Sequence, residues 1–517
     1  MFRLKPFIYL IVGVLLIGCS SSKPSEVEPN PNPKPEPPVL VNKLNSLSLV
    51  IQSNGNKVRL EGVVDAEANR VDIDYKGWID NIEYLLIDYK ATGSLFMDDK
   101  EVVAGTTELN LSSGVISFIV KSDEAKSQEY LVHLISPQTS GLPIVKIDVE
   151  NNIDIANLPK TKEYYPSTIE IADYSNKKNS LIAPGGVRGR GNSTWGYPKK
   201  PMRIKFDNKE SLFGLGAEKS WVLLANYLDP TLLMNSVAFE MAKRLNLEFT
   251  NTDFHVELFY NGDYKGNYQL TEQVQVKKER IQVDKKTGFY VELDSYYDDE
   301  FKFRTQHLNL PVLVKYPDVE SDSEMMFIQE VFDELELALL DSETIETYDL
   351  SKLIDIETFV KFMLVFEVSR NYEVQHPKSI KLYKKSDKDP ILFGPVWDFD
   401  WAYGKIEGSN HFRYFHKYRD LAFNPDQRTG KAHKFFNLFF LNKEFKDTYV
   451  RIWNEEFKRG TFNLDAFISA KALQLEASQE LNFSIWDNGL SYKEQVEQMK
   501  EWLIDRVEYI NTEVNKF

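Results

Sequence analysis

The residues best equipped for chemistry in this chain lie in a glycine-rich, basic run from position 187 to 206, VRGRGNSTWGYPKKPMRIKF. The run contains no acidic residue, although the whole chain has a net charge of -16. Its basic residues are Arg188, Arg190, Lys199, Lys200, Arg203 and Lys205. Gly189 and Gly191 flank Arg190, and glycine lets a backbone approach a ligand closely. Composition alone leaves two interpretations open, a cradle for an anion such as a phosphate or a solvated basic hairpin.

A pair of aspartates forms the second group of candidate residues. In the segment 391–404, ILFGPVWDFDWAYG, an apolar run ends at Asp398 and Asp400 among aromatic residues. Residues i and i+2 share a face in extended structure, so two carboxylates so placed can hold a hard cation such as Mg²⁺. The alternative is a pair of capping aspartates at a strand end. A carboxylate without a partner beside aromatic side chains costs free energy, and this favours the cation site.

A third group lies in the segment 369–380, SRNYEVQHPKSI. Asn371 can ligate a metal, Glu373 can accept a proton and Lys378 can contact a phosphate. His376 has no second histidine or cysteine nearby, so it does not indicate a zinc site. Elsewhere in the chain, Glu272 taken by itself indicates only a solvated residue at the end of a strand.

The composition limits the classes of function. Hydrophobic residues make up 42% of the 517 positions and aromatic residues 13%, which is ample for packed cores. The acidic balance argues against a nucleic-acid partner. It still allows an anionic ligand in a local basic pocket.

The N-terminus carries the pattern of a processing segment. Arg3 and Lys5 precede an apolar stretch from 7 to 17, and Cys19, the only cysteine, follows. This resembles a bacterial lipobox and predicts a signal peptide over 1–19, lipidation of Cys19 and a location at the cell envelope, on the outer membrane. A generic signal peptide or a core helix with a chance cysteine is the alternative. Residues 20–42 are rich in proline and predict a semi-rigid linker.

Two patterns of elements must position these residues. Short alternating runs over 43–136 predict a small all-β sandwich with an Ig-like pattern. From 142 to 517, strands come first and helices later, which predicts an α+β domain with two lobes and a site in the cleft between them. The strands are expected at 142–148, 168–172, 202–206, 254–260, 266–272 and 288–293, and helices at 236–245, 323–340 and 356–369.

Five blocks in this order resemble the CotH kinase family, named from a spore-coat protein. They are RGRGNSTWGYPKKPMRIKF, LLANYLDPTLLMNSVAFEMAKRL, YNGDYKGNYQLTEQVQVKKERI, NYEVQHPKSI and GPVWDFDWAYG. The resemblance covers about residues 142–510. It implies an atypical protein-kinase-like, two-lobed domain that transfers phosphate from ATP to protein serines with Mg²⁺ or Mn²⁺. The lipobox and the Ig-like pattern also resemble the layout of lipoproteins from Bacteroidetes-type bacteria.

The resemblance also implies roles for individual residues. Asp398 would bind metal with Asp400 in support, and Glu373 would take the proton, with Asn371 and Lys378 sharing the catalytic site. The implied nucleotide-binding set is Arg188, Arg190, Lys200, Arg203, Lys205, Glu240 and Glu272. Within it, Lys200 or Lys205 would contact phosphate, Glu240 would pair with that lysine, and Glu272 would border the adenine.

Two departures from the family pattern leave alternatives open. Glu373 stands where the family usually has aspartate, and the extra methylene moves a carboxylate by about 1 Å, enough to cost about 100-fold in rate. Met234 stands where members often have arginine. The alternatives are a pseudokinase, a non-catalytic surface protein that binds a glycan or protein partner, and a metal-assisted hydrolase. The hydrolase leaves the basic run without a role.

Overall fold

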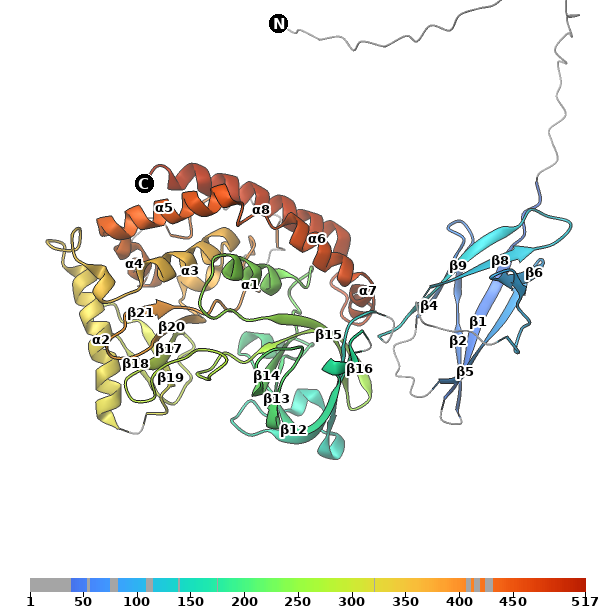
Figure 1. Ribbon diagram of the computed structural model, residues 1–517, viewed down its shortest axis with the longest axis horizontal. Coiled ribbons are helices and arrows are strands. Elements are labelled where there is room, and N and C mark those ends of the chain that lie inside the picture. Colours follow the sequence, from blue (N-terminus) through green and yellow to red (C-terminus); the bar gives the residue numbers. More distant parts are fainter. Residues whose placement is uncertain are drawn as a thin grey trace, which may run out of the picture.

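The computed structural model describes residues 39–53, 56–74, 82–107, 115–137, 140–173, 175–319, 321–405, 411–412, 419–423 and 431–517. The expected signal peptide, Cys19 and most of the proline-rich linker lie outside these ranges. No helix within them is both long and apolar enough to span a membrane. The α+β class predicted from the sequence is confirmed (Figure 1).

The N-terminal part is all β and has its own core. One sheet has the order β2-β1-β5 and the other β3-β4-β9-β8-β6-β7. The strands are β1 Leu44–Ser53, β2 Asn56–Glu61, β3 Val63–Asp65, β4 Arg70–Asp74, β5 Ile82–Ala91, β6 Ser94–Met97, β7 Lys100–Glu101, β8 Val115–Lys121 and β9 Gln128–Ile135. Alternate residues such as Leu47, Leu49 and Ile51 are buried, as the period of two along a strand requires. The buried residues of this core run from Leu44 to Leu134.

A closed barrel follows, with the strand order β10-β11-β12-β13-β14-β16-β15. Its strands are β10 Ile144–Val149, β11 Tyr165–Ala172, β12 Leu181–Gly189, β13 Met202–Glu210, β14 Glu218–Leu224, β15 Asp253–Tyr260 and β16 Asp263–Glu272. A parallel pairing of β10 with β15 closes the barrel. Helix α1, Met234–Arg244, connects β14 to β15. In β13, Met202, Ile204 and Phe206 are buried while Arg203 and Lys205 face outward, as their alternation predicted.

A second, five-stranded sheet has the order β18-β19-β17-β20-β21. Its strands are β17 Phe289–Leu293, β18 Lys302–Arg304, β19 Pro311–Tyr316, β20 Ile380–Lys384 and β21 Ile391–Phe393. The helices after the barrel are α2 Asp322–Leu340, α3 Ile356–Ser369, α4 Lys431–Leu438, α5 Lys443–Arg459, α6 Asp465–Gln474, α7 Glu476–Ile485 and α8 Tyr492–Val514.

Helix α3 is the central element of the helical part, since it contacts α1, α5, α8 and β21. It begins where the Asp355 side chain accepts a hydrogen bond from the Thr358 N–H at 2.8 Å and ends at Arg370, which is left-handed with a φ of 49°. In Figure 1, α5, α8 and α6 lie along one side of α3 and α1. The end of α3 delivers the chain directly to the segment that begins at Asn371.

Candidate functional site

A cavity of about 1290 Å³ lies between the barrel and the five-stranded sheet. Its walls come from β12 and β13 on one side and from β17, β19 and β20 on the other, with the turns after α3 and β21 between them. The residues predicted from the sequence that line it are Arg188, Arg190, Arg203, Lys205, Glu373, Lys378, Asp398 and Asp400. Three segments far apart in the sequence therefore meet in one cavity.

The barrel wall of this cavity is cationic. Arg188 on β12 stands directly opposite Arg203 on β13 in the strand register. The Nε atoms of both are buried without a hydrogen-bond partner, and within the described ranges no carboxylate forms an ion pair with either. The Tyr164 ring lies 5.4 Å from the Arg188 guanidinium and 5.7 Å from the Lys205 Nζ. Because like charges opposed across two strands destabilise a sheet, this wall is suited to an anionic ligand.

Arg190 lies between the cationic wall and the aspartates. Its guanidinium stacks 5.3 Å from the Trp397 ring. Desolvation lowers its pKa to about 10, while the charge of Asp398 opposes that shift. Arg190 is therefore still charged at neutral pH.

Asp398 and Asp400 lie on the turn after β21, and both are open to the cavity. Asp398 is left-handed, with a φ of 70°. The Asn371 Nδ2 donates to the Asp398 carbonyl oxygen at 2.8 Å, and the Ser379 hydroxyl donates to the Asp398 Oδ2 at 3.3 Å. These contacts fix the turn in a backbone conformation that few residues other than glycine adopt.

The two aspartates interact as a pair. Burial, then the charge of Asp398 and a hydrogen bond with it, raise the pKa of Asp400 well above its ordinary value. Two adjacent carboxyls behave in this way because both cannot ionise without a compensating positive charge. A bound cation would supply that charge.

Glu373 stands beside this pair. Its N–H donates to the Asn371 Oδ1 at 2.9 Å, and its Oε2 is buried with no hydrogen-bond partner among the residues that the structure describes. Burial first, then Asp398 and Asp400, raise the pKa of Glu373 to about 9. The carboxyl therefore carries a proton at neutral pH unless a positive group lies close by.

The residues of the site fit a divalent cation that is held only in part by the protein. Within the described ranges, no three Asp, Glu, His or Cys side chains are grouped so as to hold a metal by themselves. Mg²⁺ is normally bound by one or two carboxylates, with waters and substrate phosphates completing the shell. The adjacent carboxyls of Asp398 and Asp400, with Glu373 beside them in the cavity, fit that kind of site.

Four residues expected at the site lie outside the cavity wall, and one of them, Asn371, is fully buried. The Lys200 Nζ donates to the Trp195 carbonyl at 2.7 Å, because position 200 points away from the cavity. Glu240 pairs with Arg244 one helical turn later, at 2.7 Å, rather than with a lysine of the basic run. Glu272 accepts the Thr252 N–H at 2.8 Å at the end of the β15–β16 hairpin, and its place beside an adenine stays a prediction.

The structure adds residues that sequence reasoning missed. Glu292 on β17 forms ion pairs with Lys381 on β20 and, at 3.1 Å, with Lys315 on β19. Burial would raise the pKa of Glu292, but the two lysines outweigh it and lower the pKa to about 2. Nearby, burial and the charge of Glu292 raise the pKa of Asp294 to about 6. The available signal was a carboxylate in the middle of the apolar strand FYVEL, where a charge must find a partner.

The molecule is therefore an α+β protein with a cavity in which a cationic wall faces a group of acids. The family model described as CotH kinase protein matches residues 187–510. The chain belongs to the CotH kinase family, and its function is therefore of an atypical kinase-like class. A comparison with curated proteins finds no match.

Proposed function

We propose that this protein transfers phosphate from ATP to a serine or threonine of a protein acceptor, using Mg²⁺ or Mn²⁺. One observation carries the proposal: a single cavity brings Arg188 and Arg203, which form no ion pair within the described residues, together with the adjacent carboxyls of Asp398 and Asp400. Kinase chemistry needs mainly positioning and charge neutralisation, and these two walls supply both.

In this proposal the cations of the cavity bind phosphate and the aspartates bind the metal ion. Arg188, Arg190, Arg203 and Lys205 contact the nucleotide phosphates, and Asp398 with Asp400 holds the cation. The bound cation supplies positive charge that neutralises the polyphosphate and allows the acids to ionise. Lys378, whose Nζ lies 4.6 Å from the Tyr296 ring in the lining of the same cavity, offers a further charge to phosphate.

Glu373 is the proton acceptor in this proposal. As the bond between the acceptor hydroxyl oxygen and the γ-phosphorus forms, the bond to the leaving ADP oxygen breaks. The hydroxyl proton passes to the Glu373 carboxylate. Asn371 holds the Glu373 backbone in place through its 2.9 Å hydrogen bond.

We also propose that the protein acts at the cell envelope, anchored by a lipid on Cys19. The support is the sequence of residues 1–42, with its apolar stretch, lone cysteine and proline-rich linker. Radiolabelled palmitate incorporated by the wild type and lost in Cys19→Ser is the expected result. Equal labelling of both would contradict the anchor.

The transfer reaction is tested with purified protein, labelled ATP and Mn²⁺ or Mg²⁺. The wild type is expected to label itself or an added protein on serine or threonine, and Asp398→Asn to lose that labelling. Lys200→Met is the matched control, because Lys200 belongs to the same basic run but points away from the cavity. Equal labelling by wild type and Asp398→Asn would contradict the proposal.

A second candidate is a pseudokinase that binds nucleotide without transfer. The observation in its favour is Glu373, whose buried carboxyl has an orphaned oxygen and a pKa of about 9. A pseudokinase predicts that ATP raises the melting temperature while no label is transferred. In that case Glu373→Asp, which shortens the side chain by a methylene, is the variant expected to gain transfer.

A further inference from the structure

A residue outside the turn holds the backbone between the two candidate metal-binding aspartates. The Phe399 N–H, which lies between Asp398 and Asp400, donates to the Asn235 Oδ1 on α1 at 3.1 Å. Asn235 is buried and lines the cavity. The position of both carboxylates therefore depends on where the Asn235 amide stands.

Asn235 is the first member of a chain of hydrogen bonds. Its Nδ2 donates to the Asn226 Oδ1 at 3.4 Å, and the Asn226 Nδ2 donates to the Gln269 Oε1 at 3.0 Å. The Gln269 Nε2 donates to the Ser236 Oγ at 3.0 Å, and that hydroxyl donates to the Asp253 Oδ2 at 2.6 Å. Every bond donates in the same direction, away from Phe399 and towards one carboxylate. We call this set the Asn235–Asp253 chain.

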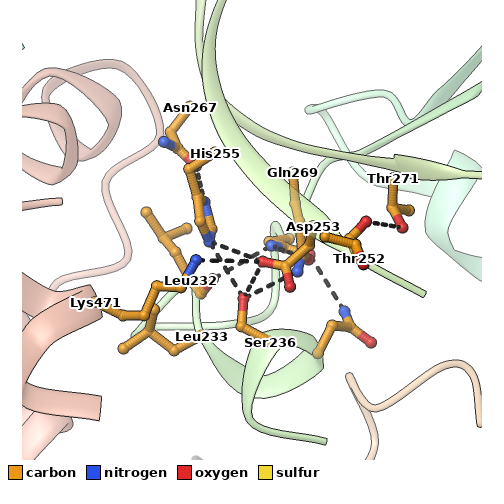
Figure 2. Close-up of polar contacts among 12 residues, drawn as sticks. Leu232, Leu233, Ser236, Thr252, Asp253, His255, Asn267, Gln269, Thr271 and Lys471 are labelled. Atoms are coloured by element: carbon orange, nitrogen blue, oxygen red, sulfur yellow. Dashed lines mark hydrogen bonds and ion pairs between the residues drawn. The ribbon is translucent and has the colours of Figure 1, made fainter. Parts of the chain in front are cut away.

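The chain ends on a buried charge, as Figure 2 shows for Ser236, Gln269 and Asp253. Burial would raise the pKa of Asp253, but Lys471 on α6 and His255 outweigh it and the pKa is lowered. The Lys471 Nζ lies 4.0 Å from the Asp253 Oδ2. The His255 Nε2 lies 3.4 Å from the Ser236 hydroxyl, and its Nδ1 lies 2.9 Å from the Asn267 Oδ1. Hydrogen bonds that run head to tail into a charge polarise and strengthen one another.

The left-handed backbone of Asp398 requires such support. A residue other than glycine keeps a φ near 70° only where the surrounding contacts determine it. Asn371 and Ser379 hold Asp398 from its own side of the cavity, and Asn235 holds the next peptide from the barrel side. The turn is clamped between elements that are otherwise unconnected in sequence.

We propose that the Asn235–Asp253 chain orients the Asp398–Asp400 turn for cation binding, with Asn235 as its positioning residue. The inference rests on the proposed function, because it takes the two aspartates as cation ligands. It extends the site from the cavity wall through β16 and β15 to Lys471 on α6. Groups that orient metal ligands typically change metal affinity by about 10-fold to 100-fold when they are removed.

The test compares two serines in matched positions. Ser236 accepts an amide N–H from Gln269 on β16 and contacts the Asp253 carboxyl on β15. Ser478 accepts an amide N–H from Asn267 on β16 at 2.9 Å and interacts with the Glu257 carboxyl on β15, but it lies outside the chain. Ser236→Ala breaks the chain at a residue that is not part of the cavity lining, and Ser478→Ala is the control of equal chemistry and burial.

Two measurements are made on full-length wild type and on each variant. The first is hydrogen exchange of the peptide that contains Phe399, measured without any ligand. We expect Ser236→Ala and Asn235→Leu to exchange this amide at least about tenfold faster, and Ser478→Ala to match the wild type. The second is Mn²⁺ affinity by calorimetry, which we expect to weaken about tenfold in Ser236→Ala and more in Asn235→Leu. If Ser236→Ala does not fold, Gln269→Met breaks the same chain at the next link.

The outcomes separate the two proposals. Unchanged exchange at Phe399 in the chain variants, or an equal change in Ser478→Ala, overturns the chain. Faster exchange with unchanged Mn²⁺ affinity overturns its role in cation binding. A wild type that shows no Mn²⁺ binding, while Phe399 exchange responds as expected, overturns the cation site of the proposed function and with it the purpose assigned to the chain.

Discussion

At the scale of single residues, like charges placed close together govern the cavity. Arg188 and Arg203 face each other across two strands, and burial with the charge of Asp398 raises the pKa of Asp400. The sequence predicted these residues because the signals are local, an acid-free basic run and an Asp-x-Asp after an apolar strand. It did not predict Glu292 or Asn235, because strand pairing and helix packing bring them to the cavity from distant positions.

A substitution of Arg203 is expected to stabilise the fold and to weaken ATP binding. Arg203→Gln should raise the free energy of unfolding by about 0.5 to 1 kcal/mol, because it removes a charge opposed to Arg188. The same change should weaken ATP affinity about tenfold, because it removes a phosphate contact. Urea unfolding without ligand and calorimetry with ATP and Mn²⁺ measure the two effects. A variant that loses stability as well as affinity would contradict the like-charge argument.

At the scale of elements, long-range contacts fix the turns that carry the site. The sequence predicted that α3 ends at Ser369, because the segment that follows is interrupted by a proline. It did not predict the closure of the barrel, because β10 and β15 pair in parallel although the α1 helix and four other strands separate them. Local periodicity reports which face of a strand is buried, but it does not report the strand's partner.

A buried ion pair ties α8 to the end of α3. Arg506 on α8 donates to the carbonyl and carboxylate oxygens of Glu367, and Glu367 also accepts the N–H groups of Ala422 and Phe423. Because both charged groups are fully buried, Arg506→Leu should lower the free energy of unfolding by about 3 to 5 kcal/mol. Arg451→Ala, which removes exposed ion pairs with Glu357 and Glu455, should change it by about 1 kcal/mol or less. Equal losses in the two variants, measured by urea unfolding, would contradict this account.

The interface of β15 with α1 and α6 gives a prediction about pH. Burial lowers the pKa of His255 from 6.5 to about 4. The unfolded chain therefore binds a proton at His255 between pH 6.5 and 4 that the folded chain does not bind, so stability falls as the pH falls through this window. The His255 contribution lost between pH 7 and 4.5 is about 2 to 3 kcal/mol. Urea unfolding at the two pH values measures this loss of stability. The His255→Gln variant should lack the His255 part of the loss. The variant His307→Gln, which changes an exposed histidine, should lose as much stability as the wild type.

At the scale of the whole molecule, the N-terminal sheets and the cavity are built from different cores. The buried residues of the sheets end at Leu134, and the barrel core begins at Val145. The charge of the cavity is divided between its walls, since Arg188, Arg203 and Lys205 lie on the barrel wall of a chain whose net charge is -16. Cations grouped on one wall attract the anionic part of a ligand, and the acids on the other wall attract its cationic part.

The separate cores predict that the cavity does not need the N-terminal sheets. A chain that begins at Ser140 should bind ATP in the presence of Mn²⁺ within about twofold of the full chain. Calorimetry on both proteins measures this, and circular dichroism shows whether the shorter chain is folded. A folded shorter chain with much weaker binding would assign the sheets a part in the site.

Calorimetric titration of ATP, with and without Mn²⁺, tests the central claim most directly. The wild type and Lys200→Met should bind ATP in the presence of Mn²⁺, and both should bind much more weakly once the metal is chelated. Asp398→Asn should lose the metal-dependent part, and Arg190→Met should weaken binding even with the metal present. Binding by Asp398→Asn equal to that of the wild type, or no binding by a folded wild type, would contradict a cavity built for a metal-bound nucleotide.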